Sequence, residues 1–187
     1  MNRFENVCIN NYDANLIALL EAQKLTNERA ETFLVYCDDC IYEGLIFSVD
    51  DESRSFVLQM TDGTKTLHLN INSLENIEMV ERWKFDYDKR NSFKIYVDDL
   101  RPAPLGYIQT QSVVETIALI ETIEDNGAVV ECLDLDHDLG DFEWLGGDAI
   151  KIIDYLVKEH KYYSINIHTA NPVGRANMLR AINRYWP

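Results

Sequence analysis

Basic residues are scarce in this chain of 187 residues. It has 17 lysines and arginines against 32 aspartates and glutamates, which gives a formal net charge of −15. An extended nucleic-acid duplex needs a basic stripe on its protein partner, so the composition excludes this class of ligand. Small anions can still bind where a metal ion or an arginine reverses the local field.

Long apolar runs are missing as well. No segment approaches the roughly 20 apolar residues of a membrane span, and the first residues, from Met1 to Glu5, lack the apolar core of a signal peptide. We therefore expect no membrane association and a cytoplasmic location. Hydrophobic residues nevertheless make up 47% of the chain, which is enough for packed cores and speaks against wholesale disorder.

Cysteine is rare too. The four cysteines are Cys8, Cys37, Cys40 and Cys132. Cys37 and Cys40 form a CxxC, but no second pair and no histidine follows at zinc-finger spacing. Strand-type residues flank this motif, which favours a two-residue hairpin turn at Asp38-Asp39 with the thiols facing each other across the strands. A structural pair of thiols is the preferred interpretation, and a redox switch or a metal ligand pair are the alternatives.

The pattern of residues 1–82 predicts a helix followed by a small β-barrel. Residues 13–25 carry a helical stripe of leucine and isoleucine, with Asp13 as the N-cap. Five short strands are expected at residues 32–37, 40–49, 55–60, 65–71 and 77–80. This order is similar to that of Sm-like and SH3-like barrels. We expect this barrel to add affinity for the substrate or to recruit a protein partner of unknown identity. Residues 83–92 are polar and mixed in charge, and we predict a linker there.

Strands and helices alternate over residues 93–187. The predicted strands span residues 93–97, 107–110, 129–135 and 164–167. The predicted helices span residues 112–124, 148–160 and 173–184. Ser112 and Glu115 have the spacing of a capping box, and Asn126-Gly127 ends the first helix. This alternation predicts an α/β domain with a parallel, Rossmann-like sheet and right-handed crossovers.

Acids and histidines stand directly after three of these strands. The residues are Asp98, Asp99, Asp136, His137, Asp138 and His168. The carboxyl ends of parallel strands meet at one edge of a sheet, where ligands bind. Gathering like charges is unfavourable unless a cation or a reaction uses them. The sequence therefore predicts a functional site at this edge, with a solvated acidic rim as the alternative.

The acids suit a magnesium or manganese ion. Mg²⁺ and Mn²⁺ prefer carboxylate and water oxygens. The predicted ligands are Asp98, Asp99, Asp136 and Asp138. Asp134 shares a strand face with Asp136 but lies deeper, so we expect it to support the site from behind.

The histidines and arginines complete the predicted chemistry. His137 and His168 can act as general acid and base together with Asp136, although a histidine at a strand end is often a structural residue. Asn171 before Pro172 predicts a capped helix start whose free N–H groups bind an anion. Arg101 and Arg175 are the expected phosphate contacts. The alternative is that these arginines only offset the acidic charge.

Four motifs occur together in the order of a known family. They are DDLRPAP at 98–104, LDHDLG at 135–140, GGD at 146–148 and HTANPVGRANM at 168–178. In these motifs residues 93–185 resemble the cyclic-phosphate processing receiver-like family. The resemblance implies a receiver-like sheet with strand order 2-1-3-4. It also implies a role in hydrolysing or binding cyclic phosphates of nucleotides or RNA ends.

A comparison with phosphorelay receivers assigns further roles. By this resemblance Asp98 and Asp99 match the metal-binding acids, Asp136 matches the phosphoacceptor and Thr169 matches the hydroxyl that contacts the phosphate. A fifth strand with its lysine is not found, and His137 stands beside the acceptor position, unlike a signalling receiver. Both differences speak against phosphorelay signalling.

The leading hypothesis is a metal-dependent phosphoesterase that hydrolyses a cyclic phosphate. The ligand would be a small phosphorylated molecule or cyclic nucleotide, or else the 2′,3′-cyclic phosphate end of an RNA. A module that captures such a ligand without turnover, or a receiver-like protein-interaction domain, is the alternative. Covalent phosphotransfer at Asp136 is a third hypothesis.

Overall fold

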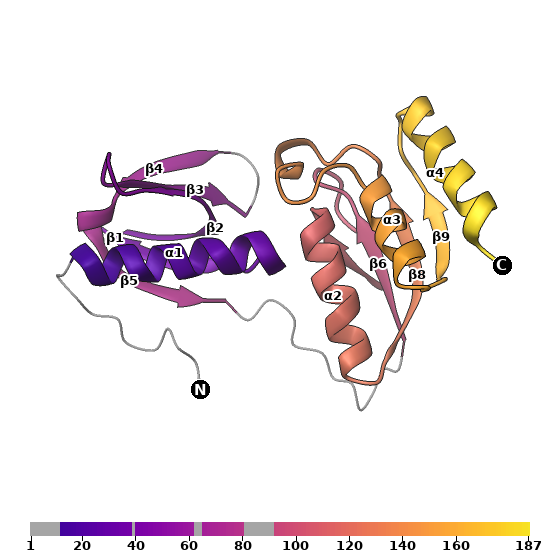
Figure 1. The fold of residues 1–187 in the computed structure, drawn as a ribbon, viewed down its shortest axis with the longest axis horizontal. Helices are drawn as coiled ribbons and strands as arrows, with labels where there is room; N and C mark the ends of the chain where they lie inside the picture. Colours follow the sequence, from indigo (N-terminus) through magenta and orange to yellow (C-terminus); the bar gives the residue numbers. More distant parts are fainter. Residues whose placement is uncertain (1–11, 39, 62–64, 81–91) are drawn as a thin grey trace. The chain divides into compact units, whose positions relative to one another are not determined.

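Two sheets of different type organise the chain. The computed structural model describes residues 12–38, 40–61, 65–80 and 92–187. Contacts divide the chain into two compact units, Met1–Lys84 and Phe85–Pro187, and each contains one sheet (Figure 1). The predicted linker, residues 83–92, lies outside the described residues except for Ser92.

The N-terminal unit is a helix followed by an antiparallel sheet. Its elements are α1 (Tyr12–Arg29), β1 (Phe33–Cys37), β2 (Cys40–Asp50), β3 (Ser55–Met60), β4 (Thr66–Asn70), the 3₁₀ helix η1 (Ile71–Ser73) and β5 (Leu74–Met79). The strands lie in the order β4-β3-β2-β1-β5, and all their ladders are antiparallel. The predicted helix and five strands are therefore present.

The core of this unit lies between α1 and the sheet. Leu19 of α1 and Phe33, Ile46 and Phe56 of the strands are almost completely buried. Asn15 lies among them with only 2% of its surface exposed. Apolar contact thus supplies most of the stabilisation of this unit, because burial of such side chains is the main favourable term in folding.

Two details of this unit differ from the sequence prediction, and a third stays untested. Helix α1 runs from Tyr12, so Asp13 lies in its first turn and is not the N-cap. Strand β5 begins at Leu74 and not at residue 77, because Leu74 is buried in the core and η1 already makes the connection. Among the described ladders β4 and β5 remain the two edges, so closure of the sheet into a barrel stays a prediction.

The CxxC forms the predicted hairpin. Cys37 and Cys40 are direct partners in the β1–β2 ladder, and Asp38 has a positive φ of 50° in the turn. Burial raises the pKa of the Cys37 thiol to about 11. Such a thiol is a poor nucleophile near neutral pH, which favours a structural role for this cysteine.

The C-terminal unit is an α/β domain with a parallel sheet. Its elements are β6 (Ser92–Val97), β7 (Tyr107–Thr110), α2 (Val113–Asp125), β8 (Val129–Leu135), the 3₁₀ helix η2 (Gly140–Phe142), α3 (Ile150–Lys158), β9 (Ser164–Ile167) and α4 (Pro172–Tyr185). All three ladders are parallel, and the strand order is β7-β6-β8-β9. This is the predicted order 2-1-3-4. In Figure 1, α2 and α3 lie side by side in front of the sheet.

Local caps place the helices of this domain. The Ser112 hydroxyl accepts a hydrogen bond from the Glu115 N–H, as predicted, but the Glu115 carboxylate accepts from Gln111 N–H, one residue earlier than a capping box requires. Gly127 adopts a φ of 73° after α2. Helix α3 is shorter than predicted and begins at Ile150, because the residues before it form tighter turns in which Lys151 N–H donates to the Asp148 carbonyl and Ile152 N–H to the Ala149 carbonyl.

The longest helix is α1, with 18 residues, and it carries several charged and polar side chains. Within the described ranges, no helix is both long and apolar enough to cross a membrane.

Candidate functional site

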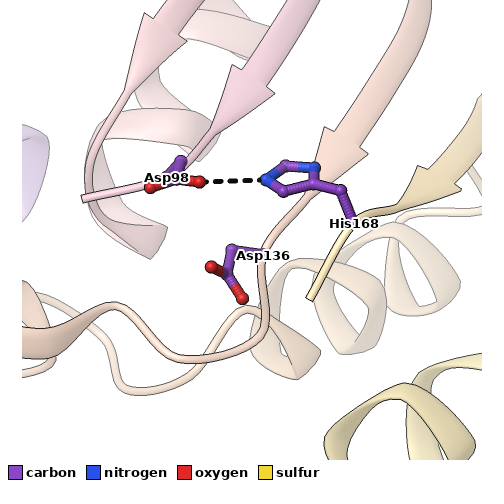
Figure 2. A group of neighbouring side chains, drawn as sticks. All are labelled: Asp98, Asp136 and His168. Carbon is purple, nitrogen blue, oxygen red and sulfur yellow. Dashed lines mark hydrogen bonds and ion pairs between the residues drawn. The ribbon is translucent and has the colours of Figure 1, made fainter. Parts of the chain in front are cut away.

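Three neighbouring strands end in polar side chains at the same edge of the parallel sheet. Strand β6 leads into Asp98, β8 into Asp136 and β9 into His168. The ladder continues past the strand ends, since Asp136 N–H donates to Val97 and His168 N–H donates to Leu135. Ligand atoms of Asp98, Asp136 and His168 all lie within 4.8 Å of one another, and Figure 2 shows these side chains next to each other. The predicted convergence of these three residues is therefore observed.

Asp98 is the most deeply buried member of this group, with 0% of its surface exposed. Its Oδ1 accepts hydrogen bonds from the N–H groups of Leu100 at 2.9 Å and Arg101 at 2.7 Å. Burial by itself would raise the pKa of Asp98, but these two hydrogen bonds and those from the side chains of Arg101 and His168 outweigh it. The pKa therefore lies below its usual value.

Arg101 joins the two carboxylates. Its Nε donates to Asp98 Oδ2 at 2.5 Å, and its Nη2 donates to Asp136 Oδ2. The other oxygen of Asp136 accepts from the His137 N–H at 2.7 Å. Arg101 thus offsets acidic charge in the described arrangement, and its predicted contact with phosphate stays a prediction. We call Asp98, Arg101, Asp136 and His168 the arginine-bridged group.

His168 is held on three sides. Its Nδ1 lies 2.6 Å from Asp134 Oδ1, and its Nε2 lies 3.1 Å from Asp98 Oδ2. The ring stacks on Tyr96, with centroids 4.3 Å apart and planes within 3° of parallel. Each ring nitrogen therefore has a carboxylate partner inside the protein. Asp134 supports the site from behind, as the sequence analysis expects.

Asp99 does not join the arginine-bridged group. A Cβ added at Gly140, which has a φ of 46°, would lie 2.3 Å from Asp99 Oδ2, so this carboxylate packs against the loop after β8. Burial raises the pKa of Asp99, and the negative charges of Asp98, Asp136 and Asp141 add to the increase. Asp99, a predicted metal ligand, therefore packs against the loop after β8 and is not one of the clustered side chains of the arginine-bridged group.

A second cluster lies in the loop after β8. Ligand atoms of His137, Asp138 and Asp148 lie within 4.8 Å of one another, and we call these residues the His137 group. His137 Nδ1 lies 2.8 Å from Asp138 Oδ1, and the Asn171 amide donates to both oxygens of Asp138. Hydrogen bonds from His137 and Asn171 lower the pKa of Asp138. The predicted ligands Asp136 and Asp138 thus belong to different clusters.

The start of α4 is capped as predicted, but its N–H groups are not free for an anion. Asn171 Oδ1 accepts hydrogen bonds from the N–H groups of Val173 and Gly174, and the Asn171 carbonyl accepts from Arg175. The expectation of an open anion seat is wrong for this arrangement, because the cap itself satisfies the donors. Gly174 is required here, since a Cβ would lie 2.3 Å from the His137 ring.

The remaining predicted phosphate contacts hold the loop between β9 and α4. The guanidinium of Arg175 donates to the Ile167 carbonyl at 2.6 Å, and the Thr169 hydroxyl accepts from Asn171 N–H at 3.1 Å. Of the predicted phosphate contacts, Arg101 forms ion pairs with Asp98 and Asp136, and 48% of its side chain is exposed.

The predicted magnesium or manganese ion does not fit the arginine-bridged group as it is arranged. A cation of this kind needs carboxylate oxygens that are open to it. Both oxygens of Asp98 already accept several donors, and Arg101 binds the same two carboxylates that an ion shared by Asp98 and Asp136 would bind.

Comparison with known families identifies this part of the chain. Residues 93–184, about half of the chain, match the family model described as the Cyclic-phosphate processing Receiver domain. The C-terminal unit belongs to this receiver family. Neither the curated proteins nor the solved structures gave a match to the chain. The match ties the domain to cyclic-phosphate processing, and the arginine-bridged group and the His137 group both lie within the matched residues.

Three residues of the site escaped the sequence prediction. Tyr96 supports the His168 ring, and the two-residue period of β6 already places it on the same side as Asp98. Asp148 lies in one of the four motifs but received no role. Gln109 of β7 donates to the carbonyls of Asp98 and Arg101, and no local signal in the sequence indicates this contact.

Proposed function

We propose that the receiver domain hydrolyses a cyclic phosphate ester and opens it to a linear monoester. The geometry of the arginine-bridged group carries the proposal. Two carboxylates, an imidazole and a guanidinium meet at the edge of the sheet where α/β domains bind ligands. Phosphoryl transfer needs proton exchange and stabilisation of charge on the phosphoryl oxygens, and these residue types supply both.

His168 is the proposed general acid. Asp134 fixes its Nδ1 and Tyr96 supports the ring, so Nε2 is the nitrogen that exchanges a proton with substrate. In the described arrangement Nε2 faces Asp98 Oδ2 at 3.1 Å. A leaving ribose oxygen would compete for this hydrogen bond and receive its proton.

The other members complete the reaction. Arg101 would turn part of its exposed guanidinium toward the phosphoryl oxygens, and Asp136 would accept a proton from the attacking water. A bond forms between the water oxygen and phosphorus, the bond from phosphorus to the ribose oxygen breaks, and His168 protonates that oxygen. One water is consumed and a phosphate monoester is released. His137, paired with Asp138, is the second candidate for the proton-accepting role.

The substrate class follows from charge. The chain carries a formal net charge of −15, which opposes binding of a long polyanion. A cyclic nucleotide or the terminal cyclic phosphate of a short RNA is therefore the proposed substrate. A protein partner of the N-terminal sheet remains a separate proposal.

A substrate panel followed by phosphorus NMR tests the function. The full chain is incubated with 2′,3′-cyclic, 3′,5′-cyclic and cyclic-dinucleotide substrates, each with Mg²⁺, Mn²⁺ or EDTA. At least one substrate should give a linear monoester with the wild type but not with His168→Ala or Asp136→Asn. Asp154→Asn, at an exposed position on α3, is the matched control. If all substrates stay intact under all conditions, the proposed hydrolysis is wrong.

Capture of the ligand without turnover is the second candidate. One observation favours it, since both ring nitrogens of His168 already have carboxylate partners inside the protein. Calorimetry and product analysis on the same sample separate the two functions. Binding with the cyclic phosphate recovered unchanged indicates a binding module, and recovery of a linear phosphate excludes it.

A further inference from the structure

The two acids of the arginine-bridged group already have a counter-ion within the chain. Asp98 is fully buried and Asp136 is 14% exposed at its side chain, and the Arg101 guanidinium donates to both. A guanidinium is a planar fork of donors that matches carboxylate oxygens and keeps its charge at any physiological pH. The guanidinium therefore offsets one of the two negative charges of the pair without a bound ion.

The position of Arg101 is built into its loop. The Arg101 N–H donates to Asp98 Oδ1, so the backbone of the arginine is tied to the same carboxylate that its side chain binds. From β7, the Gln109 amide donates to the carbonyls of Asp98 and Arg101 and accepts from the Ala103 N–H. The Gln109 amide thus fixes the loop at the backbone of Asp98, Arg101 and Ala103, and this loop holds the guanidinium beside the two acids.

We propose that Arg101 takes the place of a divalent cation at Asp98 and Asp136, so that the receiver domain binds no such ion at this pair while the arginine is present. The role of this substitution in catalysis rests on the proposed function, because Arg101 would then be the positive charge that contacts the phosphate of the substrate. The inference about ion binding does not require turnover.

Removal of the guanidinium should create a cation site. Without Arg101, two carboxylates from separate strands would face each other with only His168 to offset their charge. Close like charges are unfavourable, and a divalent cation that binds oxygen ligands relieves this repulsion. Arg101→Gln should therefore gain affinity for Mn²⁺.

Titration with Mn²⁺ followed by electron paramagnetic resonance tests this proposal. All proteins carry Asp148→Asn, which removes one ligand of the His137 group, so that the stoichiometry reports on the Asp98–Asp136 pair. The parent protein should bind no Mn²⁺ at this pair at millimolar concentration. Arg101→Gln should bind one ion at least about tenfold more tightly than the parent, and addition of Asp136→Asn should abolish the gain. Arg180→Gln, at an exposed position on α4, should behave as the parent.

Two results would overturn the proposal. One is a parent protein that binds a Mn²⁺ ion which Asp136→Asn removes, and this titration decides the matter even if Arg101→Gln does not fold. The other is a folded Arg101→Gln protein that gains no affinity. Neither result depends on substrate turnover, so failure of this proposal and failure of the proposed hydrolysis can be told apart.

Discussion

The two units of this protein bury polar side chains in different ways. In the N-terminal unit Asn15 is almost completely buried, and its amide donates to the carbonyls of Ile71 and Leu74 at 3.1 and 3.0 Å. Its partners are backbone groups, so it stabilises the place where α1 meets η1 and β5. Buried polar groups of this kind are common wherever backbone would otherwise lack a partner.

The buried Asp98 of the receiver domain has different partners. It bonds to the ionisable side chains of Arg101 and His168, which come from a loop and from a separate strand end. Clusters of ionisable groups with perturbed pKa values are typical of functional sites. The comparison indicates that the partners of a buried polar group, more than its burial, distinguish a structural residue from a candidate functional one.

Of the replacements considered, that of His168 should have the largest effect, and the quantity it changes is the rate of hydrolysis. His168→Ala should lower hydrolysis of the cyclic phosphate about 10²- to 10⁴-fold, the usual contribution of general acid–base catalysis. His68→Ala, at an exposed position on β4 of the other unit, should leave the rate unchanged. Initial rates from phosphorus NMR measure both. Equal rates for the two variants would remove His168 from the mechanism.

Replacement of the buried acid Asp98 should lower the stability of the receiver domain. Asp98→Ala leaves the N–H groups of Leu100 and Arg101 without their acceptor, which should cost about 1–3 kcal/mol of the free energy of unfolding. The half-exposed guanidinium of Arg101 keeps Asp136 as a partner and adds little to this loss. Urea unfolding of the full chain, followed by circular dichroism, measures this loss. Asp154→Ala should change stability by no more than about 0.5 kcal/mol, because both Asp154 and its partner Lys151 are exposed. A loss for Asp98→Ala as small as this control would contradict the role described for Asp98.

Replacement of the buried Asn15 should lower the stability of the protein but leave the rate of hydrolysis unchanged. Asn15→Ala leaves the carbonyls of Ile71 and Leu74 without a donor, which should cost about 1–3 kcal/mol. The rate of hydrolysis should not change under conditions where the protein is folded. A fall in rate comparable to that of His168→Ala would break the distinction between the two kinds of buried polar group.

The smallest effect is expected at Asp99, whose response to pH should be opposite in sign to that of the adjacent Asp98. The pKa of Asp98 is lowered from 3.8, so its contribution to stability is present above that pH and is lost as the pH falls through the lower, folded-state value. The pKa of Asp99 is raised from 3.8, so its contribution is present below that pH and is lost as the pH rises through the folded-state value.

It follows that Asp99→Asn should stabilise the protein at neutral pH, by about 0.5 kcal/mol, and that this gain should disappear below pH 3.8. Asp98→Asn should destabilise it at neutral pH, with the difference shrinking toward acid. Urea midpoints measured between neutral and acidic pH test both signs. A loss of stability for Asp99→Asn at neutral pH would contradict the setting described for this carboxylate.

The features that could be predicted from the sequence are those that depend on residues close together in the chain. Apolar runs that stop at Asp98, Asp136 and His168 place these side chains at one edge of a parallel sheet, whatever their exact partners. The start of α4 is also local, because Asn171 and Pro172 together specify it. Both features depend on residues within one turn or one strand of the group they position.

The hydrogen-bond partners could not be predicted in the same way. Asn171 both caps α4 and binds Asp138, which lies 33 residues earlier. The contact of Arg101 with Asp136, 35 residues later, depends on β6 and β8 being neighbours in a register that places Val97 opposite Leu135. Such long-range register is not visible in the residue pattern.

The central claim is that His168 and its neighbours act directly on a cyclic phosphate. Addition of a 2′,3′-cyclic nucleotide to the full chain, with the ring nitrogen signals of His168 followed by NMR alongside the phosphorus signal, tests this most directly. The Nε2 signal should shift on addition, and a linear monoester should then appear. An unchanged His168 signal while the nucleotide is hydrolysed, or a nucleotide that stays intact, would contradict this claim.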